Sequence, residues 1–411
     1  MMSGLEIRTV GGVDEWQLLC WASAEGDALP LEPPSADEPA RLPPSPFGVA
    51  YPVRLRGVGR VYLWADGFTT RTSPLVIERE LAQRYLKATS TLVKQYARRG
   101  APLEAVTSRL QQAQAYATKQ QWLDALAESV QAAEQGAVSV AQTRLQRMRG
   151  RTAFLWGVRT ETADAARTAL PALAAPLNLL QLTLDSSSNA WHAVIQQGQS
   201  ARIAIAASVP DKTSSPALTA ALRTLMSRHR GQVRYWTLAA LGGNDAGSGN
   251  SFSQLAALCE AARTIDFGVV RLLRGVHSFY QRQSAYPVLE QCVEMGVPFE
   301  AVHLEWRWYD GTLYDLDQLL ERYGELGKPI HLELALPPSE GYAVFTRDEP
   351  LLWLEGACLI ALSKPYVVAL RFPLIGSEAS AGLLADNNQP NSFWEQVRAL
   401  AMWNRALQEC A

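Results

Sequence analysis

Two glutamates on neighbouring predicted strands are the residues whose type and spacing could support acid–base chemistry. Residues 301–306 and 330–336 are short apolar runs typical of buried strands, and they place Glu305 and Glu333 near their ends. An acid near the C-terminal end of a parallel strand serves a site more often than a core. Side by side, the two carboxylates would form a pair in which one pKa rises, so that this member could act as an acid.

Basic residues on the same strand faces support a different interpretation. Period-2 alternation puts His331 on the face of Glu333, and it puts His303 and Arg307 on the face of Glu305. Arg307 could pair with Glu333 and hold it ionised, and we favour such a structural network over a catalytic pair. We expect both histidines to be buried and hydrogen-bonded, with no metal bound, because a third ligand cannot be placed.

Three further residues lie at predicted strand ends or in the loops that follow them. Asp185 comes directly after residues 177–184, where it could line the same mouth or cap a helix. Trp308 and Tyr309 precede the turn signal Asp310-Gly311, so their rings could stack on a sugar, although a core role is the simpler interpretation.

The elements that would position these residues alternate between strand and helix after Arg151. Strands are predicted at 153–158, 177–184, 202–207, 233–240, 268–273, 301–306, 330–336 and 366–372, with helices at 162–174, 215–229, 252–264, 284–295, 313–326, 350–362 and 392–408. Eight strands with interleaved helices predict a (β/α)8 TIM barrel, and an open doubly wound sheet is the alternative.

The first 150 residues follow a different pattern. Residues 1–74 predict a small β and proline-rich segment, with a strand at 5–10, an extended proline-rich stretch, and a hairpin within 51–70. Residues 75–150 are rich in Ala, Gln and Leu and predict helices at 76–98, 103–117 and 120–148. The barrel would then occupy residues 151–411.

Composition excludes several classes of protein. The chain has 411 residues, 48% of them hydrophobic, and a net charge of -2, so it offers no electrostatic case for nucleic acid or an anionic membrane. The five cysteines are widely spaced and predict buried thiols. The glycine-rich residues 242–249 lack the order of a phosphate loop, and no cofactor is expected. No leader or apolar span is evident, which predicts a cytoplasmic protein.

Three stretches carry motifs in a consistent order. Residues 325–342 read ELGKPIHLELALPPSEGY, residues 231–241 read GQVRYWTLAAL, and residues 381–400 read AGLLADNNQPNSFWEQVRAL. They resemble strand 7, strand 4 and the closing segment of the family 10 glycoside hydrolases, which include endo-β-1,4-xylanases. The resemblance covers residues 150–410 and implies a barrel enzyme fold. The helical residues 76–148 more loosely resemble an N-terminal extension of divergent members.

The resemblance assigns Glu333 to the nucleophile position but leaves it without a partner acid. The family's acid/base position falls on Leu241, and the asparagine before it falls on Ala240. Its Gln and His after strand 6 fall on Glu305 and Arg307, and its strand 8 tryptophan is replaced by Arg371 or Phe372. A retaining hydrolase needs two carboxyl groups, one of them protonated.

We therefore favour a degenerate, non-catalytic relative that binds a β-glycan or oligosaccharide or has a structural role. The residues expected to contact a ligand are Arg307, Trp308, Tyr309, His331 and Arg371. The alternative is an active xylan-type hydrolase with Glu333 as nucleophile and Glu305 or Asp185 as a relocated acid/base. A third hypothesis makes the helical region 76–148 a docking surface for a protein partner.

Overall fold

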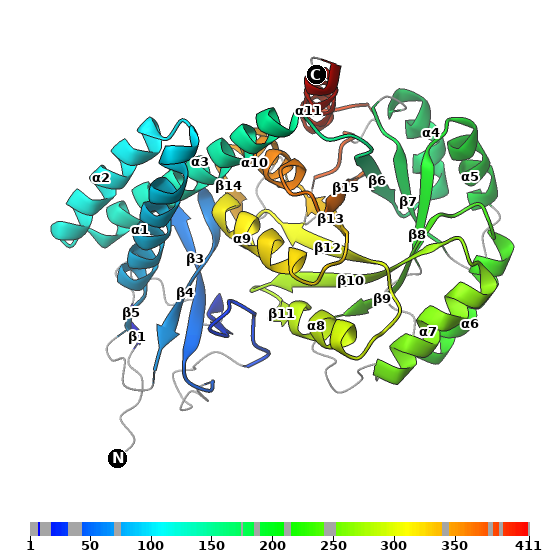
Figure 1. The fold of residues 1–411 in the computed structure, drawn as a ribbon, viewed down its shortest axis with the longest axis horizontal. Helices are drawn as coiled ribbons and strands as arrows, with labels where there is room; N and C mark the ends of the chain where they lie inside the picture. The colour runs from blue at the N-terminus through cyan, green and yellow to red at the C-terminus, as the bar shows by residue number, and fades with distance from the viewer. Residues whose placement is uncertain are drawn as a thin grey trace.

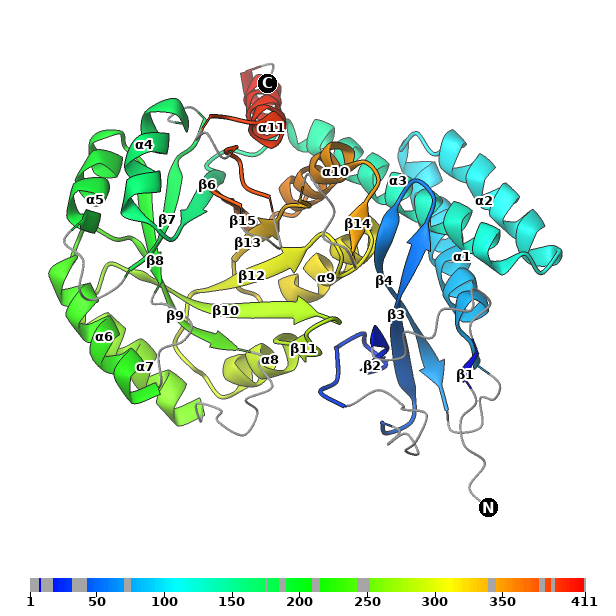
Figure 2. The same cartoon turned by 180° about the vertical axis from the view of Figure 1, so that it is seen from behind.

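The computed structural model describes residues 7–8, 18–31, 43–69, 75–173, 176–184, 190–208, 215–241, 252–338, 345–376, 381–385 and 389–409. Within these ranges, parallel strands form a closed barrel, preceded in the chain by a smaller antiparallel sheet and three long helices. Figures 1 and 2 both show the N-terminal elements on one side of the barrel. The predicted (β/α)8 fold class is confirmed.

The barrel strands follow one another around the ring in chain order. They are β6 (Leu155–Thr160), β7 (Leu179–Thr183), β8 (Ala204–Ser208), β9 (Tyr235–Leu241), β10 (Val270–Ser278), β12 (Ala301–Arg307), β13 (Ile330–Ala335) and β15 (Val367–Pro373). Pairing of β9 with β10 and of β15 with β6 closes the ring. An open doubly wound sheet is therefore excluded.

A helix follows each barrel strand. These helices are α4 (Ala163–Leu173), α5 (Ala190–Ser200), α6 (Ser215–Arg228), α7 (Phe252–Ile265), α8 (Tyr286–Glu294), α9 (Leu313–Gly324), α10 (Pro350–Leu362) and α11 (Ser392–Glu409). Sequence reasoning missed α5, although its buried residues Trp191, Val194, Ile195 and Gly198 have helical spacing. Trp191 is 3% exposed and lies on the buried face of this helix.

The lower part of the barrel interior is apolar. Strands β7, β8, β9, β10, β12 and β15 each contribute one residue to a separate buried cluster, which consists of Leu179, Ala206, Tyr235, Leu272, Ala301 and Ala369. Because side chains alternate along a strand, the next inward positions toward the C-terminal ends lie directly above this layer. The polar residues described below occupy those positions.

The smaller sheet contains strands from both parts of the chain. Its strand order is β14 (Thr346–Arg347), β4 (Gly59–Phe68), β3 (Phe47–Leu55) and β2 (Cys20–Ala22), and β14 comes from the connection between β13 and α10. The β3–β4 hairpin confirms the predicted hairpin. Gly59 has a φ of +105°, and a Cβ there would lie 2.1 Å from the Thr346 carbonyl oxygen, so only glycine lets β14 pair here.

The remaining short strands lie at the edges of these sheets. β1 (Ile7–Arg8) pairs in parallel with β5 (Leu75–Val76), and β11 (Gln283–Ser284) pairs with the end of β10. Of the strand expected at 5–10, the structure describes only β1.

The N-terminal helices pack against the barrel. They are α1 (Ile77–Tyr96), followed by a 3-10 turn at Ala97–Arg99, α2 (Glu104–Thr118) and α3 (Trp122–Met148), close to their predicted ranges. α3 contacts α1 and α2 on one side and α9 and α10 on the other. Helix α10 is apolar on nearly all sides because other elements surround it.

Some predictions concern residues outside the described ranges. These are most of the proline-rich stretch, the glycine-rich loop at 242–249, Asp185 and Cys410. The other four cysteines are buried free thiols, as expected. None of the helices in the described ranges has the length and apolar composition needed to cross a bilayer.

Arg347 of β14 joins the two parts of the molecule through buried contacts. Its guanidinium donates to the carbonyl oxygens of Trp308 (3.0 Å) and Gly311 (2.7 Å) and pairs with Glu134 of α3 at 3.0 Å. Its side chain is only 3% exposed. Removing one partner of a buried pair leaves the other charge and the carbonyl groups unsatisfied.

We therefore expect Arg347→Ala to lower the free energy of unfolding by about 3 kcal/mol in denaturant titrations. Arg405→Ala is the matched control, because the Arg405 side chain is 81% exposed and its loss should change stability by less than about 0.5 kcal/mol. Equal effects of the two substitutions would contradict this account of the interface.

Candidate functional site

The inner faces of β12 and β13 bring the two predicted glutamates together. Glu305 lies directly opposite Glu333 in the strand register, and His303 lies opposite His331 one pleat below. All four side chains are buried. The predicted placement of the carboxylates and histidines on shared inward faces therefore agrees with the register.

Glu333 is held as a buried ion. Its Oε1 lies 2.8 Å from Arg159 Nε, and its Oε2 lies 2.9 Å from His303 Nε2. Burial favours the neutral acid, but the Arg159 guanidinium and the His303 hydrogen bond outweigh it, so the pKa of Glu333 lies well below its usual range. The partner is Arg159, on the first barrel strand, and not the expected Arg307.

His303 supports Glu333 as a neutral imidazole. Burial, reinforced by the nearby Arg371 charge, lowers the pKa of His303 to about 4. A neutral ring that donates from Nε2 to Glu333 can accept at Nδ1, where Thr237 Oγ1 lies 3.4 Å away. The hydrogen bond to Thr237 thus fixes the orientation of the ring.

Glu305 has its own pair of arginines. Arg274 Nη2 contacts its Oε2, and Arg307 Nε donates to its Oε1 at 3.0 Å. Burial would raise the pKa of Glu305, as does the Glu333 charge, but Arg274 and Arg307 prevail and the pKa is lowered. The expected rise in the pKa of one carboxylate is therefore not found, because each carboxylate has a cation of its own.

Arg371 and His331 are buried and bonded to other side chains of the barrel interior. Arg371 is fully buried and donates to Gln181 Oε1 and to His331 Nδ1. Burial lowers the pKa of Arg371 to about 10, so it remains a cation near neutral pH, and it lowers the pKa of His331 well below its usual value. The two residues expected to contact a ligand are thus buried in this structure, with Arg371 opposite Glu333 and His331 opposite His303 in the strand register.

The charges in the described barrel interior do not balance. The positive residues are Arg159, Arg274, Arg307 and Arg371, and the negative residues are Glu305 and Glu333. The histidines are neutral, and the exposed Glu161 pairs with Arg159 at 3.1 Å, so an excess of one positive charge remains among these described residues. Arg159, Arg274 and Arg307 keep 29%, 16% and 21% of their side-chain surface exposed, so this excess reaches solvent at the mouth.

Trp308 and Tyr309 do not offer their rings to a ligand. Trp308 is 1% exposed and Tyr309 is 5% exposed. Tyr309 stacks on Phe345 at 4.5 Å, and its backbone carbonyl accepts from Tyr62 of the N-terminal sheet. The sugar-stacking expectation is thus corrected, because the N-terminal sheet and the β13–α10 connection cover these rings. Trp306 is also buried.

No carboxylate occupies the end of β9. Leu241 closes this strand and is buried among apolar residues, and Ala240 precedes it. Asp185, the other suggested acid, lies outside the described residues. Among the candidate acids in the described part of the chain, Glu305 is therefore the one beside Glu333.

Sequence reasoning missed Arg159, Arg274 and Gln181. The two arginines lie one residue beyond the predicted strand ends at 158 and 273, whereas the observed strands extend to Thr160 and Ser278. Continuing the alternation from Gly157 would have turned Arg159 inward. The described residues contain no cluster of three or more His, Cys, Asp or Glu side chains suited to a metal ion.

The Glu333 contacts make stability depend on pH. The folded-state pKa lies below the unfolded value of about 4.3, so the contribution is fully present above that pH and is lost as the pH falls toward the folded-state pKa. We expect Glu333→Gln to reduce the free energy of unfolding by about 3 kcal/mol at pH 7, because Arg159 loses its buried partner. The difference from wild type should shrink below about pH 4.3.

Glu161→Gln is the matched control, because Glu161 contacts the same arginine at 3.1 Å but is 68% exposed. Its effect should stay below about 0.5 kcal/mol at any pH. Denaturant titrations at several pH values measure both variants. A pH-independent effect of Glu333→Gln would contradict an ionised Glu333.

Comparisons with known proteins bear on the fold alone. No family model and no curated protein matches the sequence. Among solved structures, a xylanase from Paenibacillus barcinonensis is 11% identical, with 60% of this chain and 95% of that chain covered and a TM-score of 0.47. A GH10 xylanase from Thermobacillus composti is 12% identical, with 60% and 96% covered and a TM-score of 0.46. The strand order of this chain, not these similarities, establishes its barrel.

Proposed function

We propose that this protein is a non-hydrolytic barrel whose mouth binds an acidic oligosaccharide. The observation that carries the proposal is that Glu333 and Glu305 are both buried beside arginines, with lowered pKa values. Glycoside hydrolysis needs one carboxyl group that stays protonated to donate to the leaving oxygen. Neither glutamate meets that requirement, and the strand 4 position that would supply the acid is Leu241.

The excess positive charge supports an anionic ligand. Arg159, Arg274 and Arg307 are partly exposed around the buried carboxylates, and arginine suits carboxylate and phosphate groups because its planar fork can make two hydrogen bonds at once. A carboxylated sugar would offset the excess charge of the mouth. A neutral glycan would leave it unchanged.

The alternative is a hydrolase with Glu333 as nucleophile and a relocated acid. Adjacent strands are about 4.8 Å apart, so Glu305 is near enough for a retaining pair. Its lowered pKa argues against an acid role, since the carboxyl group would have to be protonated near neutral pH.

We expect no release of reducing sugar from xylan and no cleavage of aryl β-glycosides, because neither Glu305 nor Glu333 keeps a proton near neutral pH. The assay compares wild type with Glu333→Gln under conditions in which an active xylanase gives a clear signal. Hydrolysis that disappears in Glu333→Gln would establish the alternative function.

We expect a glucuronate-substituted xylo-oligosaccharide to bind about tenfold more tightly than its unsubstituted counterpart at low salt. The preference should decline as salt is raised, because exposed charges are screened. Titration calorimetry measures both ligands. Arg307→Gln should remove most of the preference. Arg405→Gln should leave it intact, because the Arg405 side chain is exposed on α11. Equal binding of the two ligands would exclude charge recognition at the mouth.

A further inference from the structure

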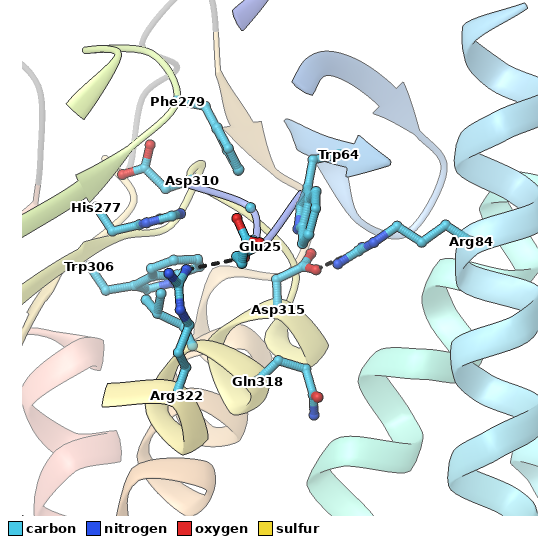
Figure 3. Close-up of a pocket in the computed structure, with 12 residues that line it drawn as sticks. Glu25, Trp64, Arg84, His277, Phe279, Trp306, Asp310, Asp315, Gln318 and Arg322 are labelled. Carbon is cyan, nitrogen blue, oxygen red and sulfur yellow. Dashed lines mark hydrogen bonds and ion pairs between the residues drawn. The ribbon is translucent and has the colours of Figure 1, made fainter. Parts of the chain in front are cut away.

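A cavity lies outside the barrel, between the barrel and the N-terminal region. It has a volume of about 130 Å³ and is lined from both sides (Figure 3). Glu25, Trp64 and Arg84 come from the turn after β2, from β4 and from α1. The barrel contributes the ends of β10 and β12 and one side of α9. A cavity of about 150 Å³ can hold a benzene-sized molecule, so this one is comparable to a single six-membered ring.

Flat rings form much of the wall. Trp64, Phe279, Trp306 and His277 all line the cavity. His277 stacks on Trp306 with ring centroids 5.9 Å apart and meets Phe279 edge-on at 5.1 Å. Burial lowers the pKa of His277 to about 4, so its imidazole is uncharged near neutral pH. Such a wall suits the C–H face of a ring-shaped ligand.

The charged groups at the cavity are largely paired with one another. Arg84 lies over the Trp64 ring and pairs with Asp315 at 3.0 Å. Arg322 donates to the Glu25 carbonyl oxygen at 3.1 Å and pairs with Asp27 at 2.6 Å. A charged ligand would have to compete with these pairs. An uncharged ligand with several hydroxyl groups could hydrogen-bond to them without breaking any pair.

Two buried polar atoms of lining residues lack partners among the described residues. They are the indole Nε1 of Trp306, a donor, and Oδ2 of Asp310, a carboxyl group whose pKa burial raises to about 7. Asp310 is fully buried, and its other oxygen accepts from Ser278 Oγ at 2.7 Å. Buried polar groups in folded proteins are nearly always satisfied by protein, water or ligand. A hydroxyl group can both donate and accept, so it suits the indole donor and a carboxyl group in either protonation state.

We infer that this cavity is a binding site for a small uncharged polyhydroxyl compound about the size of one pyranose ring. The site is separate from the barrel mouth, since its residues lie on the outer side of β10 and β12 and on N-terminal elements. A ligand here would contact both parts of the molecule.

The test is titration calorimetry with D-xylose, D-glucuronate and D-glucosamine at pH 7. We expect xylose to bind, and the anionic and cationic sugars to bind at least about tenfold more weakly, because each competes with the existing ion pairs. Trp64→Leu removes one wall and should weaken xylose binding at least about fivefold. Trp403→Leu, a partly buried tryptophan on α11, is the matched control and should leave binding unchanged.

Asp310→Asn keeps the side-chain volume and replaces the unpartnered oxygen with an amide, so it tests the site even if Trp64→Leu does not fold. It should also weaken xylose binding, whereas Arg307→Gln at the mouth should not. A structure determined with xylose should show the sugar between Trp64 and Trp306. The inference would be overturned if that structure showed only ordered water in the cavity. It would also be overturned if xylose binding were lost in Arg307→Gln and retained in Asp310→Asn.

Discussion

Burial of two carboxylates inside a closed barrel is the constraint on which the rest of the interior depends. A buried ion is costly unless it is paired and hydrogen-bonded, so Glu333 requires Arg159 and His303, and Glu305 requires Arg274 and Arg307. Three different strands, β6, β10 and β12, supply these partners, and the closed ring brings them within reach of the carboxylates. The same pairing that stabilises the buried carboxylates lowers their pKa values and keeps them ionised.

The N-terminal region depends on the barrel in a comparable way. Its sheet takes its edge strand β14 from a barrel connection, and Arg347 on that strand joins α3 to two barrel carbonyl groups. This arrangement covers Trp308 and Tyr309, and it also encloses the cavity lined by Trp64 and Trp306. The same interface therefore covers the rings of Trp308 and Tyr309 and forms the cavity beside Trp64 and Trp306.

Much of the fold follows from periodicity. Eight strands and seven of the eight barrel helices are where the alternation of apolar residues predicts them, because a parallel barrel imposes apolar strands and amphipathic helices in strict order. The missed helix α5 has buried residues at helical spacing, but no helix was predicted between the strands β7 and β8. The inward direction of Glu305 and Glu333 was likewise predictable from the sequence, because side chains alternate between the two faces of a strand.

The sequence alone determined that two glutamates and two histidines share the inside of a barrel and that Leu241, not an acid, ends the strand β9. The tertiary structure alone decided their charge state, because the arginine that neutralises Glu333 lies on the first barrel strand, 174 residues earlier in the chain. Strand closure, rather than local pattern, sets such contacts. The tertiary structure also decided that Trp308 and Tyr309 are covered, because the residues around them in the sequence do not reveal that a distant sheet buries them.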